Sequence, residues 1–180
     1  ALFVLSLVIP MAVQAVGVSQ LLTTPADQVV TRGAFLKAAI DALQIPLTDR
    51  IGAPLPRVSR ALQPYVKTAE QLDALAPFGS ELLLARGITR GQALELVFLL
   101  LRSPSSDLNV TFRDVPPGSL MEEAVALAVD RDWMRALRQG YFGTDRLLSG
   151  EEGRLLLRKV VGEAQPFPTF DGEGPSTQRV

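Results

Sequence analysis

The chain has 180 residues, of which 47% are hydrophobic and 21% are charged, a composition that supports one buried core and argues against disorder. Its 18 Lys and Arg residues are balanced by 19 Asp and Glu residues, so no global basic field is available to bind nucleic acid. Because the chain contains no Cys and no His, thiol nucleophiles, disulfides, a Ser-His-Asp arrangement and nearly every zinc site are excluded, and we expect no metal or cofactor.

The N-terminal segment 1–15, ALFVLSLVIPMAVQA, is an apolar run that ends in the small-residue pattern read by signal peptidase. We interpret this segment as a secretory signal peptide with a clipped start, and expect an exported protein of the periplasm or cell surface. The alternatives are an uncleaved membrane anchor and a buried helix of the domain. A spanning helix needs about 20 apolar residues, more than this run supplies.

Three segments begin with the same helix start. Thr31, Thr89 and Ser149 each occupy the N-cap position before an apolar pattern of helical period. The apolar residues of the three patterns are Phe35, Leu36, Ala39, Ile40 and Leu43, then Leu94, Val97, Phe98 and Leu101, then Leu155, Leu156 and Val160. Gln92 and Glu152 follow the second and third caps at the third position, so these two starts have a capping box.

The three starts are evenly spaced, since the interval from Thr31 to Thr89 is almost the same as the interval from Thr89 to Ser149. A repeat with so long an interval needs more than one helix per unit. We predict an outer helix from Pro64 in PYVKTAEQLDALA and another after the cap Ser119. Phe78-Gly79 and Phe142-Gly143 recur in the loops that follow, where we expect an aromatic plug at a tight bend.

These patterns divide the chain into units. The ranges are 16–54 for a partial first unit, 55–107 for the second unit, 108–163 for the third unit, and 164–180 for a flexible tail or linker. The third unit contains TFRDVPPGS from Thr111, the helix from Ser119, YFGTD from Tyr141 and LSGEE from Leu148. In this order the segments resemble the S-layer homology domain, a family of triple repeats, and the resemblance covers roughly residues 29–162.

The resemblance implies an all-α fold in which three helix-loop-helix repeats, the first one incomplete, have a pseudo-threefold arrangement around a central three-helix bundle. It also implies non-covalent binding of a cell-wall polysaccharide, often one with acidic pyruvyl ketals, in grooves between neighbouring repeats. The function expected on this basis is a non-catalytic module that anchors a protein to the cell envelope.

Arg32 and Arg90 are the candidate residues for binding an acidic glycan. Each occupies the first helical position after its cap, beside backbone N–H groups that have no partner within the helix. A guanidinium at this positive end of a helix suits a carboxylate, which it can bind in a bidentate fork. The alternative, given equal weight, is that each Arg is solvated or pairs with an acid of the next unit such as Asp114.

Two positions depart from the repeat pattern. Gly150 stands where the third Arg is expected, and Arg57 stands where the second unit should have the Asp that the third unit has at 114, so at least one groove is expected to be inactive. Asp114 itself is expected to orient a turn before Pro116 rather than to touch ligand. Trp133 can stack on a sugar ring or pack in the core, and core packing is the favoured alternative.

Two other functions compete with glycan binding. Glu122-Glu123 and Glu151-Glu152 are pairs of adjacent carboxylates, and a glycoside hydrolase needs two carboxylates across the scissile bond. Adjacent helical residues point about 100° apart and cannot flank one bond, and both pairs lie in first turns, so capping explains them better and no catalysis is expected. The other alternative is a periplasmic or surface protein-interaction or structural module with degenerate grooves. Its partner patch would include surface arginines such as Arg131, Arg135 and Arg138.

Overall fold

The computed structural model describes residues 18–48, 55–102 and 106–164. This part of the chain is all-helical apart from isolated β-bridges, which confirms the predicted class. The elements are α1 (Val18–Leu21), α2 (Arg32–Ala42), α3 (Gln63–Gln71), the 3₁₀ helix η1 (Ala76–Phe78), α4 (Arg90–Leu101), α5 (Leu120–Asp130) and α6 (Gly150–Ala164). The predicted signal peptide and nearly all of the predicted tail lie outside the described residues. No helix in the described ranges combines the length and the apolar character needed to cross a membrane.

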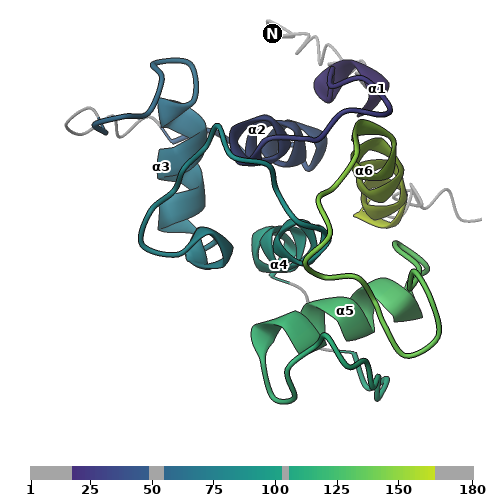
Figure 1. The fold of residues 1–180 in the computed structure, drawn as a ribbon. Coiled ribbons are helices and arrows are strands. Elements are labelled where there is room, and N and C mark those ends of the chain that lie inside the picture. Colours follow the sequence, from purple (N-terminus) through teal and green to yellow (C-terminus); the bar gives the residue numbers. More distant parts are fainter. Residues whose placement is uncertain (1–17, 49–54, 103–105, 165–180) are drawn as a thin grey trace, which may run out of the picture.

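Helices α2, α4 and α6 gather around the centre of the molecule, and α1, α3 and α5 lie outside them (Figure 1). Helix α2 packs against both α4 and α6, α3 packs against α2, and α5 packs against α4. The central core contains Phe35, Leu36, Ile40, Leu94, Leu96, Val97, Leu156, Leu157 and Val160, all of which are buried. The apolar faces predicted for the three capped helices therefore meet in one core.

The three predicted N-caps are confirmed. The side-chain oxygens of Thr31, Thr89 and Ser149 each accept a hydrogen bond from the amide three residues on, at 3.2 Å in every case. The side chains of Gln92 and Glu152 accept in turn from the amides of Thr89 and Ser149 at 3.3 Å, so both capping boxes are present. These bonds satisfy amides that a helix start would otherwise leave free.

The residues just before the three caps are joined by a closed ring of hydrogen bonds. Ile88 donates to the carbonyl of Val30, Val30 donates to that of Leu148, and Leu148 donates to that of Ile88, each over 2.9 Å. All three residues are completely buried. Segments from three distant parts of the chain therefore meet at one point, from which α2, α4 and α6 start.

The outer helices end in the same way. Asp73 and Asp132 have positive φ values of 55° and 50°, and the amides of Ala74 and Trp133 reach back to helix carbonyls at 2.8 Å, the bonding of a Schellman motif. Helix α3 therefore stops at Gln71, earlier than the predicted segment, whose later part forms a turn that leads into η1.

Two details of the predicted pattern are wrong. Leu155 does not face the core but is 41% exposed, and Leu157 is buried in the core of α6 instead. Pro64 occupies the second position of α3, not the first. The plugs are confirmed, because Phe78 and Phe142 are buried and the glycines after them have positive φ values of 70° and 87°.

Candidate ligand-binding site

The helix starts do not offer free amides, which corrects the sequence-based expectation. The first two amides of α2 donate to the carbonyls of Arg86 and Leu84, at 2.9 Å each. The first two amides of α4 donate to the carbonyls of Arg146 and Thr144, at 2.8 and 3.0 Å. With the third amide held by the cap, backbone and side chains of the protein itself take the positions that an anion would use.

Arg90 is buried, with 2% of its surface exposed, at the junction of α4, α6 and the loop after α5. Its Nη1 donates to Glu152 Oε1 at 2.5 Å, and its Nη2 donates to the carbonyls of Arg135 and Phe142 at 2.6 and 3.4 Å. The guanidinium lies over the ring of Phe142, 5.2 Å from the centroid. Arg90 therefore pairs with an acid of the next unit, but that acid is Glu152 and not Asp114.

Arg32 has a related environment without an acid. It is 6% exposed and lies over the ring of Phe78, 5.3 Å from the centroid. Its Nη1 donates to the carbonyls of Phe78, Glu81 and Leu82 at 3.4, 3.5 and 3.1 Å. No carboxylate pairs with Arg32 among the described residues. Burial, and then the charge of Arg86, lower the pKa of this guanidinium.

Glu152 joins two guanidiniums, a role that the sequence reading did not assign to it. Its carboxylate contacts Arg146 as well as Arg90, and it also completes the capping box of α6. Burial raises the pKa of Glu152, but the hydrogen bond from Ser149 and the charges of both arginines outweigh this and hold the pKa below its usual range. The signal in the sequence was its i+3 position after Ser149, which explained capping only.

Asp114 organises the loop before α6. Its carboxylate accepts hydrogen bonds from the amides of Phe142, Gly143 and Thr144 at 2.9, 2.6 and 2.8 Å. The expectation that Asp114 orients the turn before Pro116 is therefore wrong about the segment, because the carboxylate binds the loop 142–144 instead. The expected orienting role itself agrees with these bonds. Sequence reasoning placed the bond locally because Asp favours short-range turns, and the real partners lie about 30 residues on.

A pocket of about 440 Å³, called here the Trp133 pocket, opens where α4, α6 and the loop after α5 meet. Its charged lining residues are Arg90, Arg135, Glu152 and Lys159, and its larger apolar ones are Trp133, Met134, Leu137 and Leu155. Trp133 is only 6% exposed, in line with the favoured core-packing alternative, yet it lines this space. Two candidates predicted from sequence, Arg90 and Trp133, are thus brought together.

The rim of the Trp133 pocket combines charge with apolar surface. Lys159 pairs with Asp132 at 2.8 Å, and Arg135 pairs with the same carboxylate at 3.1 Å, but both cations stay partly exposed. Leu137 and Leu155 are 46% and 41% exposed. The Nε atom of Arg90 and the indole Nε1 of Trp133 are buried without a hydrogen-bond partner in the described part of the chain.

Gly150 has a steric reason for replacing the third arginine. A Cβ atom at this position would overlap the carbonyl oxygen of Pro25 and would lie 2.6 Å from that of Thr24. Arg154, one turn further along the same face of α6, donates instead to the carbonyl of Thr24 at 2.6 Å. The sequence analysis did not assign Arg154 to this junction. Its position four residues after Gly150 indicates a shared helix face only once the helix and its neighbours are known.

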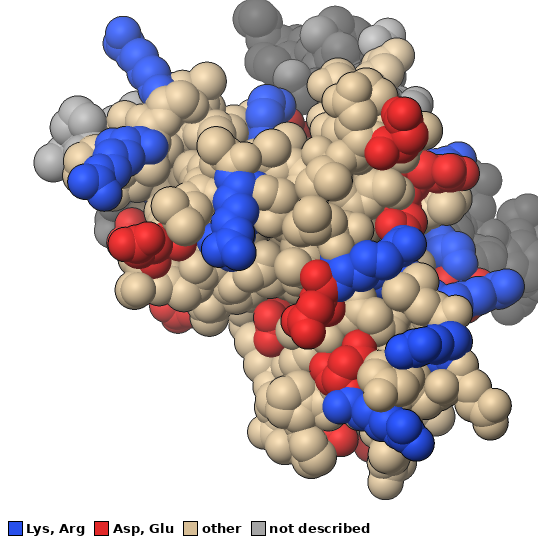
Figure 2. Space-filling model, in the orientation of Figure 1, with Lys and Arg blue, Asp and Glu red and all other residues tan. Residues whose placement is uncertain are grey.

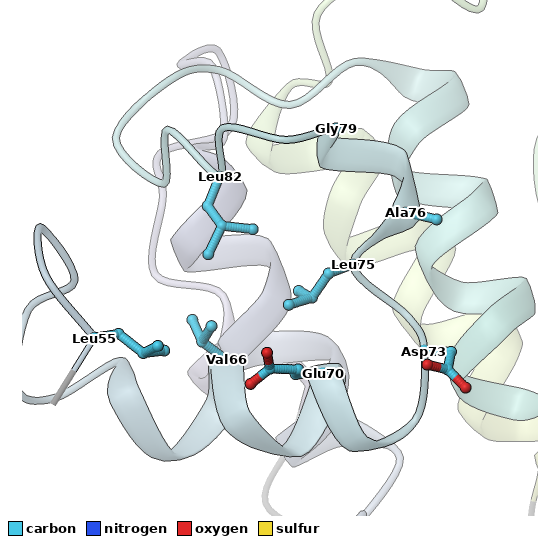
Figure 3. A pocket seen from close by; sticks show the side chains of 8 residues that line it. All are labelled: Leu55, Val66, Glu70, Asp73, Leu75, Ala76, Gly79 and Leu82. Carbon is cyan, nitrogen blue, oxygen red and sulfur yellow. The ribbon is translucent and has the colours of Figure 1, made fainter. Parts of the chain in front are cut away.

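A second pocket, of about 490 Å³, lies within the second unit (Figure 3). Leu55, Val66, Leu75 and Leu82 point towards its interior, whereas Asp73 points away from it (Figure 3). The corresponding place in the third unit is filled by an aromatic pair, Phe112 and Phe142, whose ring centroids are 5.5 Å apart. This pocket lacks cations and is not a candidate for an acidic ligand.

The charged surface agrees with the near-neutral composition. On the face in Figure 2, acidic and basic side chains lie interleaved over the part of the molecule that holds α5, and uncharged surface dominates the centre. Recognition of an anion must therefore come from a local site. No protein-family model matches the chain, and no curated protein matches it with significant similarity.

Proposed function

We propose that this protein is an exported, non-catalytic module that binds an acidic cell-wall polysaccharide and so anchors itself, or a protein joined to it, to the cell envelope. In this proposal the three units are S-layer homology repeats with pseudo-threefold symmetry. The closed hydrogen-bond ring of Val30, Ile88 and Leu148 supports that symmetry, because it gives the three capped helices equivalent starting points.

The Trp133 pocket carries the proposal. It lies at a junction between units, and it combines cations with apolar surface, which a glycan with carboxylate groups and C–H faces requires. Lys159 and Arg135 are the exposed cations that would meet the carboxylate. Arg90 is buried in the pocket wall and donates hydrogen bonds to the carbonyls of Arg135 and Phe142. Its contribution is therefore mainly to position the wall of the pocket.

Co-sedimentation with native wall sacculi, and with sacculi stripped of secondary polymer, tests the proposal. We expect the wild-type chain to sediment only with native sacculi. The variant Arg135→Glu/Lys159→Glu should lose at least about tenfold in affinity, because it replaces two attractive charges with repulsive ones. Equal sedimentation of this variant and the wild type would contradict the role of the Trp133 pocket.

A matched control comes from the same helix. Arg158 is exposed on α6 and does not line the pocket, so Arg158→Glu reverses one charge outside the pocket, half the charge change of the double variant, and should keep binding. Trp133 is the chain's single tryptophan, so its fluorescence reports directly on the pocket during titration with solubilised polymer. A spectral change with acidic polymer and none with deacidified polymer is expected.

The second candidate function is protein binding. Val29 and Leu147 are 45% and 47% exposed and flank Gly87 beside the hydrogen-bond ring, so they form an apolar spot at the junction of the three units. Wild-type protein that sediments with neither kind of sacculi would favour this function over envelope anchoring.

A further inference from the structure

The segments 82–84 and 142–144 occupy corresponding places in the second and third units. The last carbonyl of each accepts from the second amide of an inner helix, α2 for 82–84 and α4 for 142–144, at 2.9 and 3.0 Å. The first carbonyl accepts from the arginine that starts the same helix, at 3.1 and 3.4 Å. The middle residue has positive φ in both, 40° at Leu83 and 87° at Gly143. The two backbones therefore follow the same course.

The amides of the two segments differ in their acceptors. In the third unit all three amides donate to one carboxylate, that of Asp114. In the second unit Arg57 stands at the sequence position of that Asp, and the amides of 82–84 donate to no acceptor among the described residues. Three backbone donors that hold a carboxylate in one unit are thus left without it in the other.

A second carboxylate is also missing from the second unit. In the third unit Glu152 joins Arg90 and Arg146. Their counterparts at the preceding junction are Arg32 of the first unit and Arg86 of the second unit, and the counterpart of Glu152 is the neutral Gln92 of the second unit. Neither Arg32 nor Arg86 forms an ion pair within the described ranges. The junction of the first and second units therefore has two arginines that form no ion pair within the described ranges, next to three amides without a protein acceptor there.

Arg86 and the segment 82–84 border a pocket of about 520 Å³ that is lined by residues 56–58 and 80–86. The lining includes residues 82–84 together with Arg57 and Arg86, and Glu81 is the single acid in it. Its volume lies within the range for small-ligand sites. No residue lines both this pocket and the Trp133 pocket, so the two sites are separate.

We propose that this second-unit pocket binds a small carboxylate ligand of the size of a sugar acid, and that the ligand takes the place that the Asp114 side chain has in the third unit. The ligand carboxylate accepts from the amides of 82–84, and Arg57 and Arg86 flank it. Successive backbone amides in such a turn form an anion-binding concavity, and guanidiniums add charge-assisted bonds. This site does not depend on the proposed envelope binding, because it recognises the carboxylate of a small ligand at a pocket separate from the Trp133 pocket.

An NMR titration of the ¹⁵N-labelled chain with sodium glucuronate tests this site, with glucose as the neutral control. We expect the amide protons of 82–84 to shift downfield together and to saturate. The amides of 142–144 should stay unmoved because Asp114 already occupies them. Glucose should leave both segments unchanged. Unmoved 82–84 amides with glucuronate, or equal shifts with glucose, would overturn the proposal.

Two substitutions at one exposed position sharpen the test. Arg57→Gln removes a flanking charge and should weaken glucuronate binding about three- to tenfold. Arg57→Asp places a carboxylate at the sequence position that corresponds to Asp114 and reverses the charge beside the pocket, and Asp tolerates the positive φ of 65° found there. This variant should no longer bind glucuronate. Wild-type affinity in Arg57→Asp would contradict the proposal, whatever the result with sacculi.

Discussion

At the scale of single residues, three guanidiniums serve the same structural purpose. Arg32, Arg90 and Arg154 each donate to a carbonyl of the loop that precedes the next ring segment, at 3.1, 3.4 and 2.6 Å. Each carbonyl lies the same distance along the chain before a member of the hydrogen-bond ring. Arginine suits this task because its planar fork can reach several acceptors while its stem packs in the interior. The candidate ligand residues are thus part of the framework as well.

Asp114→Asn should destabilise the protein by about 1–3 kcal/mol near neutral pH, because an amide replaces a carboxylate that accepts three backbone bonds. Asp145→Asn, at an exposed aspartate of the same loop, should change stability by less than about 0.5 kcal/mol. Urea unfolding measures both free energies. Equal losses in the two variants would show that the charge of Asp114 carries no special contribution.

Asp114 also predicts a pH dependence. Burial raises its pKa, but the hydrogen bonds from Thr144, Phe142 and Gly143 outweigh burial and place the folded-state pKa below the ordinary value. The stabilisation is therefore complete above the unfolded-state pKa of about 3.9 and is lost as pH falls through the folded-state pKa. The gap in unfolding free energy between wild type and Asp114→Asn should narrow below about pH 4. A constant gap from neutral pH down to strongly acidic pH would argue against this account.

Glu152→Gln should cost about 1–3 kcal/mol, because it leaves the buried Arg90 without its acid while the amide side chain can keep the capping box, as Gln92 does. Glu151→Gln, one residue earlier and exposed, changes only the interaction with the helix dipole and should cost less than about 0.5 kcal/mol. Guanidinium chloride or urea titrations distinguish the two. A larger effect at Glu151 would contradict the assignment of the buried pair.

At the scale of elements, each inner helix is specified at its start more strongly than along its length. At the start of α2, α4 and α6, the N-cap, the preceding ring segment and the first two helix amides all form hydrogen bonds. The outer helices are instead fixed at their ends, by Schellman motifs at Asp73 and Asp132. The start of α6 is the most crowded, because the chain of 24–25 passes directly over Gly150.

Two glycines of α6 provide a matched test of this crowding. Gly150→Ala should destabilise the protein by several kcal/mol, on the order of 2–4 kcal/mol, because the added Cβ meets backbone oxygens that cannot turn aside. Gly162→Ala has open space around it and should stabilise the helix by about 0.5–1 kcal/mol. Thermal unfolding followed by circular dichroism measures both. A tolerated Gly150→Ala would contradict the close approach of 24–25.

At the scale of the whole molecule, the hydrogen-bond ring makes the three units interdependent. Its donors come one from each unit, and each is completely buried, so no unit can open without breaking a bond to another. A repeat protein of stacked units can unfold in parts, but a closed ring favours one cooperative transition.

Amide hydrogen exchange tests this cooperativity. The amides of Val30, Ile88 and Leu148 should exchange with the same free energy, equal to that of global unfolding, because each bond depends on all three units. Amides at helix starts near the surface, such as Glu151, should exchange faster. If Val30 exchanged much faster than the other two, the short first unit would open on its own.

The positions of α2, α4, α5 and α6 and their caps could be predicted from the sequence, whereas α1 and η1 were not predicted and α3 is shorter than predicted. N-cap chemistry is local, so Thr31, Thr89, Ser149 and the capping boxes follow from side chains three residues apart. Most of the core also followed from helical periodicity. The face of α6 was misjudged at Leu155, because neighbouring apolar residues fit more than one helical register.

The tertiary structure alone decided what the polar residues do. The carboxylate of Asp114 and the guanidiniums of Arg32 and Arg90 find partners 28 to 62 residues away, at distances along the chain over which sequence spacing carries no geometric information. The same is true of the amides at the helix starts, which the sequence presents as free and the fold satisfies. Capping bonds and apolar periodicity depend on neighbouring residues, so they can be predicted from the sequence. The partner of a buried charged group depends on which distant segments pack together, so only the tertiary structure determines it.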